Sequence, residues 1–96
     1  PIPVDQLISP HRSDILARKA VFDLAAEHRD ILDTEEFFEL ASQSLYGVWF
    51  RKIVVPGLGL AGASEQEQTT LLRQAVSRAT HLFVSFEAIT RWDSAM

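Results

Sequence analysis

Three glycines near the middle of the chain have the spacing of a phosphate-binding turn. Gly57, Gly59 and Gly62 follow the pattern G-x-G-x-x-G, after the apolar segment 53–55. In a dinucleotide site such glycines let the backbone approach a pyrophosphate at a helix N-terminus. Pro56 interrupts the passage from strand to turn, however, and neither a second strand nor the acidic residue expected about 20 positions later follows. We therefore expect a flexible loop between helices and no bound cofactor.

The three histidines are too far apart in the sequence to indicate a metal site. His11, His28 and His81 form neither a pair at i and i+4 nor a Glu-x-x-His motif, which are common ligand arrangements on one helix. The chain has no cysteine, and none of its serines stands in a Gly-x-Ser-x-Gly or Ser-x-x-Lys context. We expect no metal, no catalytic residue and no enzymatic activity.

Acidic side chains are concentrated in one part of the chain, where Arg29 is the single base among them. Paired carboxylates act in general acid–base catalysis only where a pocket separates their pKa values. A run of charges at a helix junction more simply indicates a solvated face. The alternative is a docking surface for a basic protein, as in an immunity protein or a secretion chaperone. The acids are Asp23, Glu27, Asp30, Asp33, Glu35, Glu36 and Glu39.

Length and composition indicate a small globular protein. The 96 residues are 47% apolar and 23% charged, which is richer in apolar residues than a disordered chain. The net charge of −4 argues against nucleic-acid binding, which favours a basic surface. The apolar stretch 45–63 is interrupted by charges, proline and glycines, so we expect no membrane span. We expect a cytoplasmic protein, and the excess of arginine over lysine suggests a bacterial source.

The hydrophobic pattern predicts a single all-α domain over residues 1–96, with three helices, or four if the segment 48–55 is separate. The prolines at positions 1 and 3 predict an extended arm, and Ser9 followed by Pro10 suits a helix start. Asp33 with Glu36, and Ser64 with Glu67, have the form of helix-capping boxes. The predicted elements are an arm over 1–9, helices over 10–32 and 33–55, a glycine-rich loop over 56–63 and a helix over 64–93.

The end of the second predicted helix is the ambiguous boundary. Residues 48–55 are rich in β-branched and aromatic side chains, which also suit a strand. We favour a helix to about Lys52, because a lone strand would have no partner elsewhere in the chain.

The last predicted helix is longer than the domain that it belongs to. About 28 residues at 1.5 Å each give roughly 42 Å, whereas a domain of this size has a diameter of about 33 Å. Apolar residues continue to its far end, and a second copy of the chain would cover them. We therefore expect a homodimer. The alternative is that the helix kinks or stops near Val84.

This surplus of apolar residues suggests that the protein works by binding another protein. We expect a non-enzymatic regulatory or adaptor protein, for example an inhibitor that masks an apolar surface of a transcription factor. A small ligand-binding protein or enzyme, with aromatic residues around a pocket, is a further alternative. Large apolar anchors commonly dominate the energy of an interface. The predicted interface residues are Leu58, Leu60, Leu72, Val76, Phe83, Phe86, Ile89 and Trp92.

Overall fold

The computed structural model describes the backbone of residues 10–95 and the side chains of residues 12–89. Every regular element in this range is helical, which confirms the all-α class. The predicted arm over residues 1–9 and the Ser9 cap lie outside the described residues. In chain order the elements are α2 (Pro10–Glu27), the 3-10 turn η1 (Arg29–Ile31), α3 (Glu35–Gln43), α4 (Leu45–Trp49), the π-helical turn η2 (Phe50–Val54), α5 (Val55–Gly57) and α6 (Glu65–Ala95).

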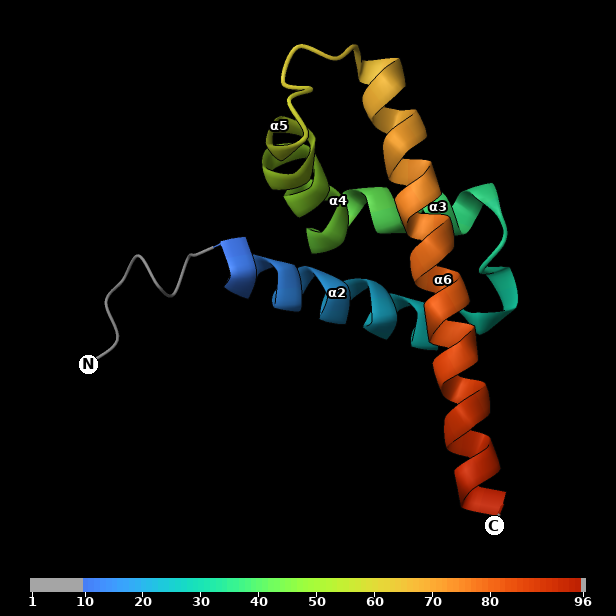
Figure 1. Ribbon diagram of the computed structural model, residues 1–96. Helices are drawn as coiled ribbons and strands as arrows, with labels where there is room; N and C mark the ends of the chain where they lie inside the picture. The colour runs from blue at the N-terminus through green and yellow to red at the C-terminus, as the bar shows by residue number, and fades with distance from the viewer. Residues whose placement is uncertain (1–9, 96) are drawn as a thin grey trace, which may run out of the picture.

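The helices form a flat body from which one helix projects. The molecule measures 47 × 41 × 19 Å along its principal axes. Helix α4 packs against α2 and α3, while α6 contacts α2, α3 and η2. At 31 residues α6 is about 46 Å long, and it does not stop at Val84. Its C-terminal end extends past α2 and the other helices (Figure 1). The overhang predicted from its length is therefore present.

The single helix predicted over 33–55 is divided at Ser44. This residue has an extended backbone (φ −78°, ψ 174°), and its Oγ accepts a hydrogen bond from the backbone N–H of Tyr46. Ser44 Oγ also donates to the carbonyl of Ala41 (2.6 Å), so it joins the end of α3 to the start of α4. A Cβ on Gly47 would lie 2.0 Å from the carbonyl oxygen of Ser42. Glycine at position 47 therefore allows α4 to lie this close to the end of α3.

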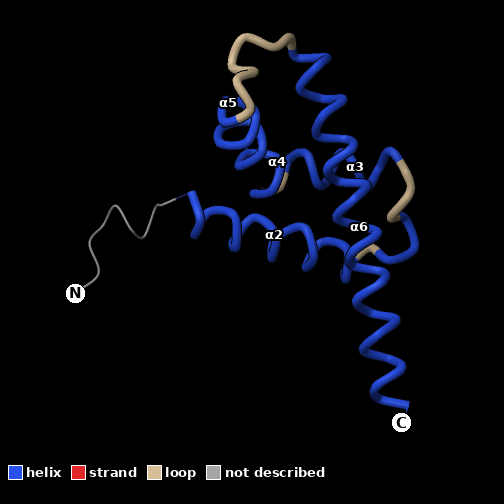
Figure 2. Tube along the Cα trace, viewed as in Figure 1, coloured by secondary structure: helices blue, strands red, loops and turns tan. Residues whose placement is uncertain are grey.

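The segment 48–55 is helical, and the helix extends further than Lys52. It continues through η2 and α5 to Gly57, so Pro56 lies inside a helix rather than in the predicted loop. In an α-helix the ring of Pro56 would clash with the carbonyl of Lys52. The wider π-helical turn, in which the N–H of Val55 bonds to the carbonyl of Phe50, gives the proline ring room. The loop then follows α5 as an open connection (Figure 2).

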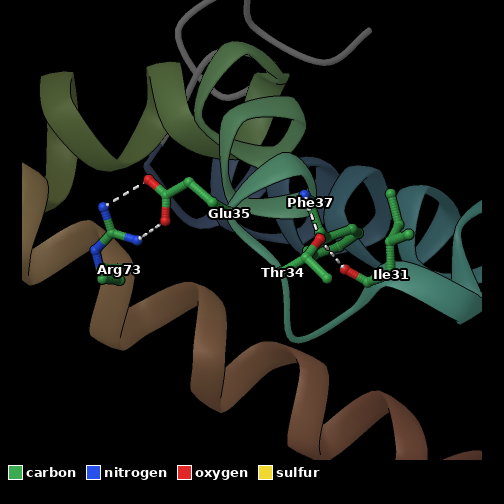
Figure 3. A network of polar contacts seen from close by, with 5 residues as sticks. All are labelled: Ile31, Thr34, Glu35, Phe37 and Arg73. Atoms are coloured by element: carbon green, nitrogen blue, oxygen red, sulfur yellow. Dashed lines mark hydrogen bonds and ion pairs between the residues drawn. The ribbon is translucent and has the colours of Figure 1, made fainter.

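The cap of α3 is one residue later than predicted. Thr34, not Asp33, is the N-cap, and its Oγ1 accepts from the backbone N–H of Phe37 (3.3 Å). Thr34 Oγ1 also donates to the carbonyl of Ile31 (2.7 Å), which ties α3 to the preceding turn η1 (Figure 3). The first predicted helix is likewise shorter, because α2 ends at Glu27 and η1 follows as a separate turn.

The core consists of side chains from all the main helices. From α2 it takes residues at i, i+4 and i+8, which lie on one face of that helix. From α6 it takes residues spaced by four and three, which define the inner face of that helix. The buried apolar residues are Ala17, Val21, Ala25, Phe37, Phe38, Ala41, Tyr46, Phe50, Val55, Leu72, Val76, Ala79 and Phe83.

At the start of α6 the Ser64 half of the predicted capping box is present. Ser64 Oγ accepts from the backbone N–H of Glu67 (3.1 Å) and donates to the Glu67 carboxylate (3.3 Å). We expect Ser64→Ala to lower the free energy of unfolding by about 0.5–2 kcal/mol, because a helix N–H loses its acceptor. Urea denaturation followed by circular dichroism measures this change. Ser77→Ala is the control, since Ser77 is exposed within α6; an equal loss in both variants would contradict the capping role.

Candidate functional site

The predicted interface residues divide into two groups in the structure. Three of them, Leu72, Val76 and Phe83, are buried in the core of the chain itself, with exposed fractions of 1%, 4% and 7%. They lie on the face of α6 that packs on the rest of the domain and do not offer a free surface. The other described members are exposed: Leu58, Leu60, Phe86 and Ile89. The side chain of Trp92 lies outside the described residues.

A stripe of exposed apolar residues follows the overhanging part of α6. Leu82, Phe86 and Ile89 are spaced by four and three residues, so they lie on one face of the helix. Their exposed fractions are 59%, 64% and 61%. We call these three residues the α6 stripe. Sequence reasoning placed Phe86 and Ile89 in the interface but left out Leu82, although its i, i+4, i+7 relation to them marks the same face.

At its inner end the α6 stripe reaches a pocket between α2, α4 and α6. The cavity has a volume of about 280 Å³. Three aromatic side chains from α4 and η2 form one wall, with ring centroids 5.6 Å apart for Tyr46 and Trp49 and 6.5 Å apart for Trp49 and Phe50. Leu82 belongs to both the pocket and the α6 stripe. The residues around this aromatic pocket are Arg18, Val21, Phe22, Tyr46, Trp49, Phe50, Ala75, Arg78, Ala79 and Leu82.

The charges around the aromatic pocket are positive, although the chain is acidic overall. Arg18 and Arg78 line it, and no carboxylate does. Arg18 Nε is 2.7 Å from the carboxylate of Asp14, one turn earlier on α2. Burial raises the pKa of Tyr46, and the two arginines partly oppose that shift. The ionisable groups that line the pocket are therefore two guanidinium groups and a neutral phenol, which suit binding of an anion rather than acid–base catalysis.

One further polar group lies near the aromatic pocket. The indole N–H of Trp49 is buried and has no hydrogen-bond acceptor among the described residues. A buried donor without a partner is destabilising by about 1–3 kcal/mol. Trp49 is thus the residue of the aromatic wall whose polar group has no acceptor among the described residues.

The carboxylates of the acidic segment are exposed, and one of them, Glu35, joins two helices. All seven carboxylates predicted to form a solvated face are exposed. Glu35 receives two hydrogen bonds from Arg73, at 2.5 and 3.0 Å, which join α3 to α6 (Figure 3). These bonds lower the pKa of Glu35 and raise that of Arg73. The Arg73 guanidinium also lies 4.2 Å from the ring centroid of Phe38.

A second ion pair holds α6 near the end of α2. Arg29, just after α2, donates to the carboxylate of Glu87 and lies over the ring of Phe83 at 6.0 Å. Phe83 also packs edge to face against Phe22, with 5.9 Å between ring centroids. These contacts hold α6 against the end of α2 directly beside the α6 stripe. The first residues of the overhang are therefore positioned by the body of the protein.

The glycine pattern forms the end of a helix and a loop. Gly57 is the last residue of α5, and Gly59 has a positive φ of 78°, which the left-handed conformation after a helix requires. Because the described residues contain no strand, the pattern lacks the βαβ setting of a dinucleotide site. Leu58 and Leu60 are 60% and 37% exposed on this loop.

The two histidines whose side chains the structure describes, His28 and His81, belong to no ligand set. Among the side chains that the structure describes, no group of three or more histidine and acidic residues is placed to hold a metal ion. No helix in the described part of the chain has both the length and the apolar character that crossing a bilayer requires. The aromatic pocket and the α6 stripe are the two neighbouring features that share Leu82.

Comparison with known proteins gives no assignment. Neither the protein-family models, nor curated proteins, nor solved structures show a match to this chain.

Proposed function

We propose that this chain is a non-enzymatic regulatory or adaptor protein that acts by binding another protein through the α6 stripe and the aromatic pocket. The observation that carries the proposal is the exposure of Leu82, Phe86 and Ile89, at about three fifths each, on one face of a helix that projects from its domain. Contiguous apolar patches bounded by polar residues are typical of interaction sites. The lining of the pocket supports binding rather than catalysis.

The energetics of the α6 stripe suit an anchor region. Fully burying a large apolar side chain is worth about 1.5–3 kcal/mol, and these three have most of that burial still to gain. Taking about 200 Å² for each side chain, the three offer roughly 350 Å². A stable interface buries about 800 Å² on each partner. The contact must therefore extend beyond the stripe, and the aromatic pocket is the surface that continues it through Leu82.

The homodimer expected from the sequence would use the same surface. Two copies packed through the α6 stripe alone bury less than half the area of a standard interface, by the same arithmetic. Dimerisation through this face therefore stays a prediction, and analytical ultracentrifugation of the isolated protein tests it.

The test of the proposed function is comparative capture of binding partners. We expect the immobilised wild-type protein to retain partner proteins that the triple variant Leu82→Ser, Phe86→Ser, Ile89→Ser loses, because serine removes the apolar contacts. Val84→Ser is the matched control: Val84 is 50% exposed on the same helix but on its opposite side. Unchanged circular dichroism spectra show that the variants remain folded. Retention of the same proteins by all variants would contradict the proposal.

A further inference from the structure

The aromatic pocket and the α6 stripe form one continuous surface. Ala75, Arg78, Ala79 and Leu82 line the pocket from α6, and the stripe continues the same spacing outward. From residue 75 to residue 89 the helix rises about 21 Å. This length equals about four turns of a helix laid alongside α6. In Figure 1 the C-terminal end of α6 extends past α2 and the other helices.

The shape of this surface selects an extended occupant. The pocket, at about 280 Å³, has room for one large side chain rather than for a whole domain. Beyond Leu82 the surface is the convex face of α6, which forms no pocket wall. An occupant that uses both must insert one apolar residue into the pocket and continue along the stripe. An amphipathic helix with apolar residues at i, i+3 or i+4, and i+7 meets this requirement.

The charges around this surface indicate the charge of the partner that binds there. Arg18 projects from α2 and Arg78 from α6, and both line the aromatic pocket without a carboxylate among the lining residues. Asp14 neutralises part of the charge of Arg18, at 2.7 Å. On the far flank Glu87 is neutralised by Arg29. A local excess of positive charge on a chain of net charge −4 favours an acidic partner at this surface and repels a basic one.

We propose, on the basis of the function proposed above, that the occupant is an acidic amphipathic helix of a partner protein. One of its apolar side chains fills the aromatic pocket, and those of its next turns cover Leu82, Phe86 and Ile89. Its flanking carboxylates pair with Arg18 and Arg78. Arginine is suited to this role because its planar guanidinium group binds a carboxylate through two parallel hydrogen bonds.

The experiment selects peptides from a displayed library on the full chain. The library contains helical peptides of about 16 residues, matched to the length of the surface, with apolar residues at helical spacing and random flanks. We expect selected peptides to be enriched in aspartate and glutamate at the flanks. Fluorescence anisotropy is then expected to give at least a tenfold tighter Kd for a selected peptide than for its copy with lysine at each acidic position.

Charge-reversed variants of the protein test whether the preference for acidic peptides depends on the arginines of the aromatic pocket. Arg78→Glu is expected to weaken binding of the acidic peptide at least tenfold and to strengthen binding of its lysine copy. Lys52→Glu, which changes the net charge equally at an exposed position of η2, is expected to change either Kd by less than twofold. Equal binding of the two peptides, or equal effects of the two variants, would overturn the acidic assignment and leave the proposed function standing.

The remaining outcomes separate this inference from the proposed function. If no acidic peptide is selected while the Leu82, Phe86 and Ile89 variant still loses its captured partners, the acidic helix is wrong and the protein-binding function stands. If the isolated protein is a dimer that Phe86→Ser dissociates and that peptides do not disrupt, a second copy occupies the surface and the inference is overturned. If neither peptides nor partners depend on the α6 stripe, both proposals fail.

Discussion

Gly47→Ala is expected to destabilise the fold by about 3 kcal/mol or more. The added methyl group would lie 2.0 Å from the carbonyl oxygen of Ser42 and 2.6 Å from its carbonyl carbon. Overpacking by one carbon typically lowers stability by about 1–3 kcal/mol, and here the obstacle is backbone, which has no alternative rotamer. Because α4 contacts both α2 and α3, a displaced α4 disturbs the whole body. Urea denaturation followed by circular dichroism measures the loss.

Gly57→Ala is the matched control for this prediction. Gly57 is also helical, at the end of α5, but no atom lies within 4 Å of the position that its Cβ would take. Alanine there is expected to leave the free energy of unfolding unchanged or to raise it by up to about 1 kcal/mol, because glycine is the more flexible in the unfolded chain. If both variants lose the same stability, the effect at position 47 is one of general helix content and not of the contact with Ser42.

The sequence predicts the elements whose signals are local. Ser64 caps the N–H of Glu67, and no glycine or proline interrupts the helix after them, so α6 is recognisable from its own residues. At Ser44 the local evidence is ambiguous, because serine is tolerated within a helix and is also a good cap. The close approach of Gly47 to Ser42 favours a helix cap at Ser44 over a continuous helix. That contact exists only once α4 has folded back on α3.

The difference between local signals and tertiary contacts also explains which residues of the candidate site could be predicted. Phe86 and Ile89 could be predicted as exposed, because they lie where the helix outruns its domain. Phe83 belongs to the same apolar run, but the tertiary contacts with Phe22 and Arg29 bury it. The position of Phe22 relative to α6 depends on how α2 crosses that helix.

An aromatic-lined pocket is one of the alternatives that the sequence leaves open, but the two arginines of the aromatic pocket could not be predicted, for a related reason. Arg18 and Arg78 are far apart in the sequence and meet only across the packing of α2 against α6. Each arginine alone reads as an ordinary charge on a helix surface. Only the folded chain places both of them around one pocket with Tyr46, Trp49 and Phe50.

Phe37→Ala is expected to lower the free energy of unfolding by about 3–5 kcal/mol. The Phe37 side chain is fully buried, with an exposed fraction of 0%, and its removal leaves a cavity between helices that the rigid backbone closes only in part. A small domain has about 5–15 kcal/mol of stability in all, so this change removes a large share of it. Thermal and urea denaturation measure the effect, and we expect no partner binding by the unfolded fraction.

Phe86→Ala separates folding from recognition in the same assays. Phe86 is the same residue type at an exposed fraction of 64%, so its loss is expected to change stability by less than about 1 kcal/mol. Binding of the selected acidic peptide is nevertheless expected to fall at least tenfold, because Phe86 is the largest side chain of the α6 stripe. A Phe86 variant as unstable as the Phe37 variant would show that the overhang is part of the core. A stable Phe86 variant with unchanged partner capture would remove the α6 stripe from the interface.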